Sequence, residues 1–273
     1  NLSTGVLIEE GPEVGKAVDA LHADVSAEFT FGLDANLLPK GLAGMSSIKI
    51  NKAEGVCSDA KDLFTRLKLS LDLTTIHELN LNLSRSGTTL SEIKMSGPFN
   101  SETLDADLEI SVTGIDRNLL SFATGRLGLD VGETAINSTT SIQLRENAGR
   151  VNVKGTLDVA KLSVKKDTLQ TPVVDSELAY QLGVDVPGKS AALEILDLGI
   201  TQTGRELVVA TLSKPLSVAW GDEPGVKDDS ELRFKVSNLN LADWAAVAGD
   251  YVSAGVANAD WRIVAANDGA DVS

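Results

Sequence analysis

The sequence predicts an all-β protein built on one elongated, twisted and mostly antiparallel sheet with a few short helices. Three observations lead to this class: apolar and polar residues alternate along most of the chain, polar turn clusters separate the alternating runs, and one short phrase recurs. Alternation with period two places apolar side chains on one face of a sheet and polar side chains on the other, which is typical of antiparallel strands with one solvated face. We count roughly sixteen candidate strands, most economically joined as a meander.

Clear alternation of apolar and polar residues begins after the first 24 residues. The clearest ones lie at 67–73, 79–83, 104–112, 151–153, 157–159, 178–186, 196–200, 216–220 and 232–236. Turn clusters at 84–87, 97–100, 146–149, 187–189 and 221–225 separate them. We therefore divide the chain into an irregular or helical N-terminal segment, residues 1–24, and a repetitive β domain, residues 25–273. Glu13 to Leu21 is a candidate short helix, and Val56 to Phe64 is an irregular insertion with a possible helical turn.

A phrase of the type Gly-Leu-Asp-Ala-Asn-Leu-Leu occurs three times, at Gly32–Leu38, Gly114–Leu120 and Asn238–Trp244. The starts of these copies are 82 and 124 residues apart, and a weaker copy lies at Leu157–Leu162. The offsets are close to multiples of about 41 residues, a period that indicates a repetitive architecture. The chain is therefore more consistent with stacked β-units than with a scaffold around one active site.

Each strong copy of the phrase contains a residue suited to begin a helix. Asp34, Asp116 and Asn240 can accept a hydrogen bond from a backbone N–H of the following turn. Asp243 stands at the position that completes a capping box with Asn240. We therefore expect each of these three strands to run into a helix of one to three turns.

The composition excludes several classes of function. A net charge of -15 opposes direct binding to nucleic acid or to an anionic membrane surface. Cys57 is the single cysteine, so an intrachain disulfide is impossible. The two histidines are His22 and His77, so the chain has few of the ligands that a His/Cys zinc site needs. The chain contains no signal peptide and no apolar run long enough for a transmembrane helix. Because it begins at Asn1, we expect it to be a fragment, with any membrane anchor outside it.

Candidate reactive groups are sparse. His77 beside Glu78 could form an acid–base pair, but a turn residue on a solvated face is the favoured interpretation. Cys57 has no adjacent base, which favours an inert thiol. Residues 267–271 resemble a calcium loop but lack the distal glutamate, and the acidic residues around 222–229 fit a surface loop. With no phosphate-binding glycine loop and no nucleophile elbow, we expect neither an enzyme nor a bound cofactor or metal.

The apolar side of such a sheet needs a cover. A closed sandwich or barrel would supply one, and so would a strongly curved sheet whose trough is filled by an external apolar molecule. Aromatic residues number 11 of 273, and the inward stripes are mostly Leu, Val, Ile and Ala. A compact core often uses more large rings, whereas an aliphatic lining suits alkyl chains.

The strand patterns carry a family resemblance. Leu-x-Leu-x-Leu strands, the segment from Phe234 to Trp244, its continuation through 255–263, and the strand from Val151 to Leu162 together resemble the AsmA-like family of Gram-negative envelope proteins. The resemblance covers about residues 25–273 and is weakest before Ala60. It implies a taco-shaped β-groove in the periplasm, tethered to the inner membrane through a segment absent here. It also implies phospholipid transport between the two membranes or support of outer-membrane assembly, with phospholipid acyl chains and envelope proteins as partners.

A trough of this kind would be lined by the inward residues of the best-alternating runs. We expect the lining to include Leu67, Leu69, Leu71, Leu73, Leu104, Leu108, Ile110, Val151, Val153, Leu182 and Val184. At about 4.8 Å between neighbouring strands, sixteen strands would span roughly 75 Å. The alternative is a β-sandwich scaffold or adhesin that binds a protein or glycan through its loops. A carbohydrate module fits less well, because Trp220, Trp244 and Trp261 mostly fall on inward phases.

Overall fold

The structure is a computed structural model, and it describes residues 21–37, 39–53, 61–124, 127–221, 225–226, 229–248, 254–266 and 269–272. The predicted helix at Glu13–Leu21 and the insertion at Val56–Phe64 lie largely outside these residues, as does Cys57. Within them, Leu21 begins the first strand, so residues 21–24 belong to the sheet and not to a separate N-terminal segment.

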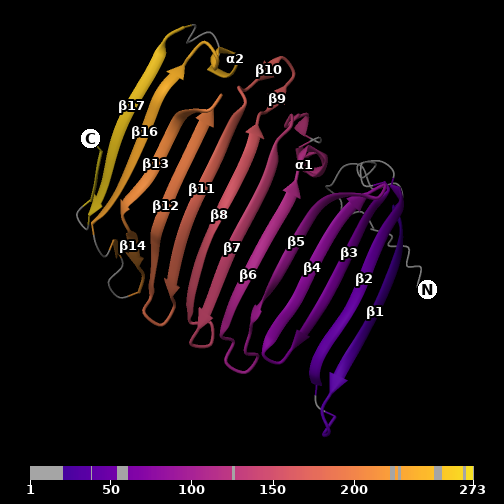
Figure 1. The fold of residues 1–273 in the computed structure, drawn as a ribbon. Coiled ribbons are helices and arrows are strands. Elements are labelled where there is room, and N and C mark those ends of the chain that lie inside the picture. The colour runs from indigo at the N-terminus through magenta and orange to yellow at the C-terminus, as the bar shows by residue number, and fades with distance from the viewer. Residues whose placement is uncertain are drawn as a thin grey trace, which may run out of the picture.

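Sixteen strands form one sheet, and two more form a small separate hairpin (Figure 1). The strands of the first half are β1 (Leu21–Leu33), β2 (Pro39–Ala53), β3 (Leu63–Asp72), β4 (Thr75–Arg85), β5 (Thr88–Pro98), β6 (Ala106–Ile115), β7 (Ala135–Arg145) and β8 (Arg150–Leu162). Those of the second half are β9 (Lys165–Lys166), β10 (Leu169–Gln170), β11 (Val174–Asp185), β12 (Ser190–Gln202), β13 (Arg205–Lys214), β14 (Leu216–Ala219), β15 (Gly225–Val226), β16 (Ser230–Asn240), β17 (Val256–Ala266) and β18 (Gly269–Val272). The helices are α1 (Arg117–Thr124) and α2 (Ala245–Ala248).

The sheet is an open antiparallel meander. Its order is β1-β2-β3-β4-β5-β6-β7-β8-β11-β12-β13-β16-β17-β18, with β14 and β15 off this path and β9–β10 as the separate hairpin. The all-β class, the antiparallel pairing and the approximate strand number are confirmed. Because two strands lie off the path, thirteen spacings of about 4.8 Å give a sheet about 62 Å across, shorter than the expected 75 Å. None of the described helices has the length and apolar character needed to cross a membrane.

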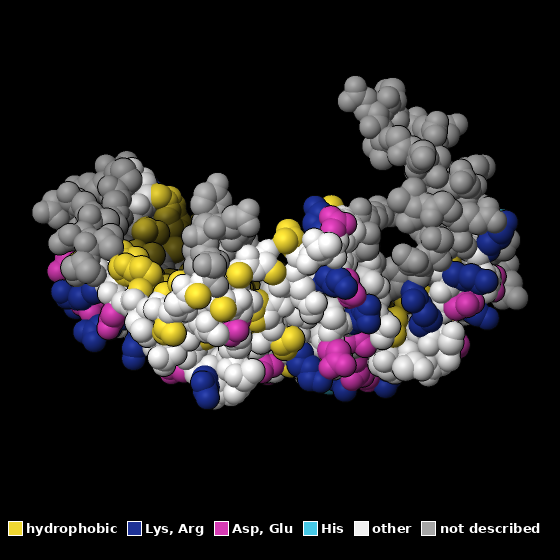
Figure 2. Space-filling view, turned by 90° about the horizontal axis from the view of Figure 1, so that it is seen from above, with side chains coloured by type: hydrophobic (Ala, Val, Ile, Leu, Met, Phe, Trp, Pro, Cys, Tyr) yellow, Lys and Arg dark blue, Asp and Glu magenta, His cyan; other side chains and the backbone are white. Residues whose placement is uncertain are grey.

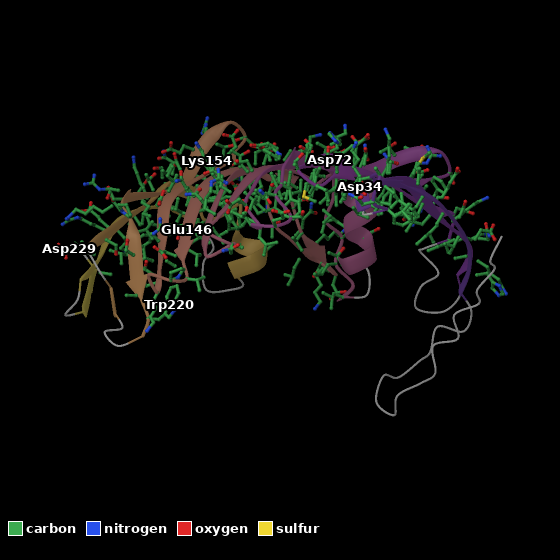
Figure 3. The ribbon with its side chains drawn as sticks, turned by 90° about the horizontal axis from the view of Figure 1, so that it is seen from below. Asp34, Asp72, Glu146, Lys154, Trp220 and Asp229 are labelled. Atoms are coloured by element: carbon green, nitrogen blue, oxygen red, sulfur yellow. The ribbon has the colours of Figure 1, made fainter. Side chains whose placement is uncertain are left out.

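The sheet is bowed, and α1, α2 and the hairpin β9–β10 lie on one side of it. Seen from above, the bow has a hollow side, where hydrophobic side chains are visible, and a convex side with many acidic and basic ones (Figure 2). Figure 3 places Lys154 and Asp72 on the convex side, opposite α1 and α2. The hairpin β9–β10 also reaches α2, although β11, β12 and β13 separate their parent strands in the sheet. These elements therefore overhang one end of the strands, at the hollow side.

The four copies of the repeated phrase adopt different structures. Asp116 caps α1 as expected, accepting hydrogen bonds from the backbone N–H groups of Asn118 (2.9 Å) and Leu119 (3.3 Å). The Asp34 copy forms only a turn, because Leu37 has φ +65° and β2 already begins at Pro39. After Asn240 the chain makes a turn before α2 begins at Ala245, so that helix is only four residues long.

The weak copy at 157–162 remains inside β8, where the backbone is paired on both sides. The capping box at Asn240 also differs from the expected one. The Asn240 side chain accepts a bond from the Ala242 N–H at 3.2 Å, and its own amide donates to Asp243 Oδ1 at 3.0 Å. Asp243 therefore contacts the capping side chain, where a capping box would have it bind the backbone N–H.

Candidate functional site: the two faces of the sheet

Register pairs trace the two faces of the sheet directly, since residues opposite one another in antiparallel strands point to the same side. One unbroken row of such pairs crosses thirteen strands from β1 to β17, and we call the side on which it lies the apolar face. The row consists of Ala27, Ser46, Leu67, Leu81, Ile93, Val112, Ser138, Leu157, Leu178, Leu198, Ala210, Phe234 and Trp261. Ser46 and Ser138 are its only polar members. The apolar face is therefore continuous across almost the whole sheet.

The neighbouring row, one residue along each strand, is polar and defines the opposite face. It consists of Glu28, Met45, Lys68, Asn80, Lys94, Ser111, Thr139, Thr156, Ala179, Asp197, Thr211, Arg233 and Arg262. Since Lys154, two residues before Thr156 on β8, lies on the convex side in Figure 3, this polar face is the convex one. The apolar face is thus the hollow side of the bow.

The apolar face is only partly covered. Most of its Leu, Ile and Val side chains are half-buried, and Val25, Phe29 and Phe31 of β1 are 42%, 40% and 68% exposed. Fully buried hydrophobic residues are few among those described: Leu90, Ala106, Val131, Val174, Leu207 and Ala210. Four of these six, all except Ala106 and Ala210, lie at the end of the strands where α1, β9–β10 and α2 are found, so that end is capped and the rest of the face is open.

The total accessible surface agrees with an uncovered face. The chain exposes 17369 Å². A compact protein of 28.6 kDa is expected to expose about 11,300 Å². A single-layer sheet that lacks a second layer over its apolar side is expected to exceed the compact value in this direction.

Nine of the eleven expected lining residues lie on strands of this face. Leu67, Leu69 and Leu71 are on β3, Leu108 and Ile110 on β6, Val151 and Val153 on β8, and Leu182 and Val184 on β11. The last four form two direct pairs, Val153 with Leu182 and Val151 with Val184. Leu108 is linked to Val153 through Ile142 of β7. The residues thus belong to one connected surface.

Leu73 and Leu104 are not brought onto the face by strand pairing. Leu73 lies in the turn after β3 and is 52% exposed, because Asp72 ends the strand by accepting hydrogen bonds from the Thr74 N–H and hydroxyl. Leu104 lies in the connection before β6, with φ +53° and 45% exposure. In both cases the apolar–polar alternation of the sequence continues beyond the end of the strand.

Several other residues of the apolar face were not among those expected, although the sequence carries the same signal for them. Leu79, Leu81, Met95, Ile142 and Leu196 pair directly with the expected residues or continue their rows. The alternation Val25, Ala27, Phe29, Phe31, Leu33 along β1 is equally visible in the sequence. Alternation alone does not give the register, which determines which residues of neighbouring strands lie opposite one another.

Polar side chains on the polar face contact one another both between strands and within a strand. Glu92 Oε1 accepts a bond from the Asn80 amide at 2.8 Å and its Oε2 lies 2.8 Å from the Lys94 Nζ, which together lower the pKa of Glu92, Lys94 having the larger effect. Lys68 and Glu78 form an ion pair at 2.6 Å. These contacts stabilise the sheet on the side that water reaches.

Two hollows on this polar face have several charged side chains in their walls. One, of about 330 Å³, lies among Arg145, Arg150, Asp185 and Glu194, and another, of about 570 Å³, among Arg66, Lys68, Asn80 and Glu92. Charged walls of this kind do not suit acyl chains.

Among the described residues, the candidate pair of His77 and Glu78 does not form. His77 lies in β4, not in a turn, and its Nε2 is 2.9 Å from Asp72 Oδ2, while Glu78 pairs with Lys68. Hydrogen bonds from Thr74, and then from His77, lower the pKa of Asp72 to about 2. His77 and Asp72 are both largely exposed. In the described part of the chain, no group of three His, Cys, Asp or Glu side chains could hold a metal ion.

The tryptophans do not form an exposed platform of stacked rings. Trp261 packs against Phe234 across β16 and β17, with ring centroids 5.4 Å apart. Trp220, 41% exposed, follows β14 at the opposite end of the sheet from Trp244. The most extensive feature of the molecule is therefore the apolar face. No protein-family model, curated protein or solved structure matches this chain.

Proposed function

We propose that the apolar face binds the acyl chains of phospholipids, with the bowed sheet acting as a groove of the taco-shaped kind. The observation that carries this proposal is the central row of apolar side chains, continuous over thirteen strands and half-exposed along most of its length. An acyl chain crossing water exposes methylenes at a cost of about 0.8 kcal/mol each. A continuous apolar surface removes that cost without any catalytic group, so the role requires no enzyme.

The cellular setting follows from the family resemblance. In that setting the chain belongs to the periplasm, joined to the inner membrane by a segment outside this sequence, and its groove carries phospholipids between the membranes or supports outer-membrane assembly. The cap formed by α1, β9–β10 and α2 then closes one side of the path, while the other side remains open along the strand ends.

The first experiment is lipid extraction and mass spectrometry on the chain purified from a Gram-negative host. The same chain purified under denaturing conditions is the control. Phospholipids released in near-stoichiometric amounts from the native sample alone support the groove. A lipid-free protein that unfolds cooperatively contradicts the groove and favours a β-scaffold or adhesin that binds its partner through loops.

Two substitutions on the apolar face test where the lipid lies. Leu71→Asp and Leu108→Asp each place a carboxylate among apolar side chains, so we expect bound phospholipid to fall by about tenfold or more. Because both leucines are half-exposed, the new carboxylates can still reach water and the sheet should stay folded. Ser111→Asp, on the polar face of the same strand as Leu108, is the matched control and should retain lipid. Loss of cooperative unfolding in both leucine variants would instead indicate a closed core.

A further inference from the structure

Two hydroxyl groups contact each other near the middle of the apolar face. A second row of paired residues runs Phe29, Gly44, Leu69, Leu79, Met95, Ile110, Thr140, Gly155, Tyr180 and Leu196. Within it, Thr140 and Tyr180 carry the only hydroxyl groups. The Tyr180 hydroxyl oxygen lies 2.9 Å from Thr140 Oγ1, and we call these two groups the hydroxyl pair.

Gly155 makes this contact possible. Thr140, Gly155 and Tyr180 stand opposite one another on β7, β8 and β11, so the tyrosine ring must cross β8 to reach β7. A Cβ atom at Gly155 would lie 2.7 Å from the Tyr180 hydroxyl oxygen and 2.9 Å from its Cζ. The missing side chain is therefore the space that the ring occupies, and the hydroxyl is held over the apolar face among Ile110, Val153 and Leu182.

The hydroxyl pair has donor capacity to spare. Two hydroxyl groups carry two hydrogens, and their mutual bond uses only one. Among the described residues, neither the Thr140 hydroxyl nor the Tyr180 hydroxyl has another hydrogen-bond partner, and both residues are half-buried. Water can satisfy the second hydrogen while the face is empty. An acyl chain lying on the face would exclude that water and leave a buried donor unsatisfied, which is unfavourable.

We propose that the hydroxyl pair donates a hydrogen bond to the ester carbonyl oxygen of a bound glycerolipid. This inference rests on the proposed function and specifies its ligand: a lipid whose acyl chains are attached through esters. An ester carbonyl is a good acceptor at the boundary between the polar and apolar parts of such a lipid, whereas an ether oxygen at the same position accepts weakly. The pair therefore favours ester lipids over ether lipids and fixes where the glycerol region sits on the sheet.

The test compares two probes that differ only in the carbonyl group. A short-chain diester phosphatidylcholine and its diether analogue with identical chains, both below their critical micelle concentrations, are titrated into the chain by calorimetry. We expect the diester to bind about fivefold to tenfold more tightly, the effect of one hydrogen bond. Tyr180→Phe and Thr140→Val should bring the two probes to within about twofold of each other.

The controls separate this role from a structural one. Thr65→Val removes a hydroxyl from the same face outside the pair, and it should keep the preference for the diester. Thermal melting of each variant establishes that it is folded, and Thr140→Val, which preserves side-chain shape, serves if Tyr180→Phe is unstable. Equal binding of the two probes to the unmodified chain, or a preference retained by both variants, overturns the inference but leaves the proposed function standing. If neither probe binds, both the inference and the proposed function fail.

Discussion

Glu231 lies at the start of β16 with only 5% of its surface exposed, and two arginines enclose its carboxylate. Its Oε2 is 2.7 Å from Arg262 Nη2, and its Oε1 is 3.0 Å from Arg233 Nε. The hydrogen bonds from Arg262 and then Arg233 lower the pKa of Glu231 from 4.5 to about 2. The site is at the end of the sheet away from the helices, so it joins β16 to β17 where no cap covers them.

This lowered pKa predicts a specific loss of stability in acid. A carboxyl whose pKa is lower in the folded state contributes stability that is complete above its unfolded pKa and is lost as the pH falls through the folded one. We therefore expect the free energy of unfolding to fall between about pH 4.5 and about pH 2 through Glu231. Asp72, whose pKa falls from 3.8 to about 2, adds to the lower part of this range.

Chemical denaturation of Glu231→Gln over this pH range isolates the Glu231 contribution. The stability difference between the unmodified chain and this variant should shrink as the pH falls and vanish below about pH 2. A constant difference for Glu231→Gln would mean that its carboxylate is not preferentially stabilised in the folded state.

Gly97 illustrates a second constraint at the scale of one residue. It lies in β5 with φ +143°, and a Cβ atom there would approach the Asp107 carbonyl oxygen to 2.0 Å. We expect Gly97→Ala to lower the free energy of unfolding by about 1–3 kcal/mol. Gly199→Ala is the matched control: Gly199 is also in a strand but has no atom within 4 Å of the added carbon, so its substitution should be neutral or slightly stabilising. Equal losses in both variants would contradict the steric argument.

At the scale of an element, α1 depends on Asp116, the capping residue just before it. The Asp116 carboxylate accepts hydrogen bonds from two N–H groups that an eight-residue helix cannot satisfy internally. We expect Asp116→Ala to cost about 1 kcal/mol of stability and to speed amide exchange in α1 more than in β6. Asp116→Asn, which keeps an accepting oxygen, should restore most of the protection. Unchanged exchange in α1 after Asp116→Ala would show that packing on the sheet alone holds the helix.

The strands could be predicted from the sequence more reliably than the helices. Alternation along β3, β6 and β11 is a local signal that the completed sheet reinforces, because each strand buries part of one face. The repeated phrase is a local signal as well, but a helix forms only if enough residues follow before the next strand. After Leu37 the next strand starts two residues later, so no helix can propagate. The position of His77 beside Asp72 could not be foreseen either, since it depends on the register shift between β3 and β4 at Ser70 and Leu71, which leaves His77 as an extra residue in β4.

At the scale of the whole molecule, an uncovered face should alter the thermodynamics of unfolding. Taking the unfolded chain to expose about 41,500 Å², unfolding uncovers about 24,000 Å² here, against about 30,000 Å² for a compact protein of equal mass. We expect the heat-capacity change of unfolding, measured by calorimetry, to be about 20% below that of a compact protein of this length. An ordinary heat-capacity change would imply that the face is covered in solution, and sedimentation over a range of concentrations would detect self-association as the cause.

Bound lipid should raise the heat-capacity change of unfolding. Lipid on the apolar face adds surface that becomes exposed when the sheet unfolds and the complex dissociates, so the heat-capacity change should rise toward the compact value. The melting temperature should also rise with lipid concentration, because the ligand binds only the folded sheet.

The strand order has a consequence for how such a molecule can change in size. Almost every strand touches only its two neighbours, so the chain behaves as a one-dimensional array whose cohesion is the sum of adjacent pairings. Strands gained or lost at either border change the reach of the surface by about 4.8 Å each and leave the remaining registers intact. Damage to a middle strand, by contrast, interrupts the array and separates two intact halves. Variation should therefore be tolerated at the borders and selected against in the interior.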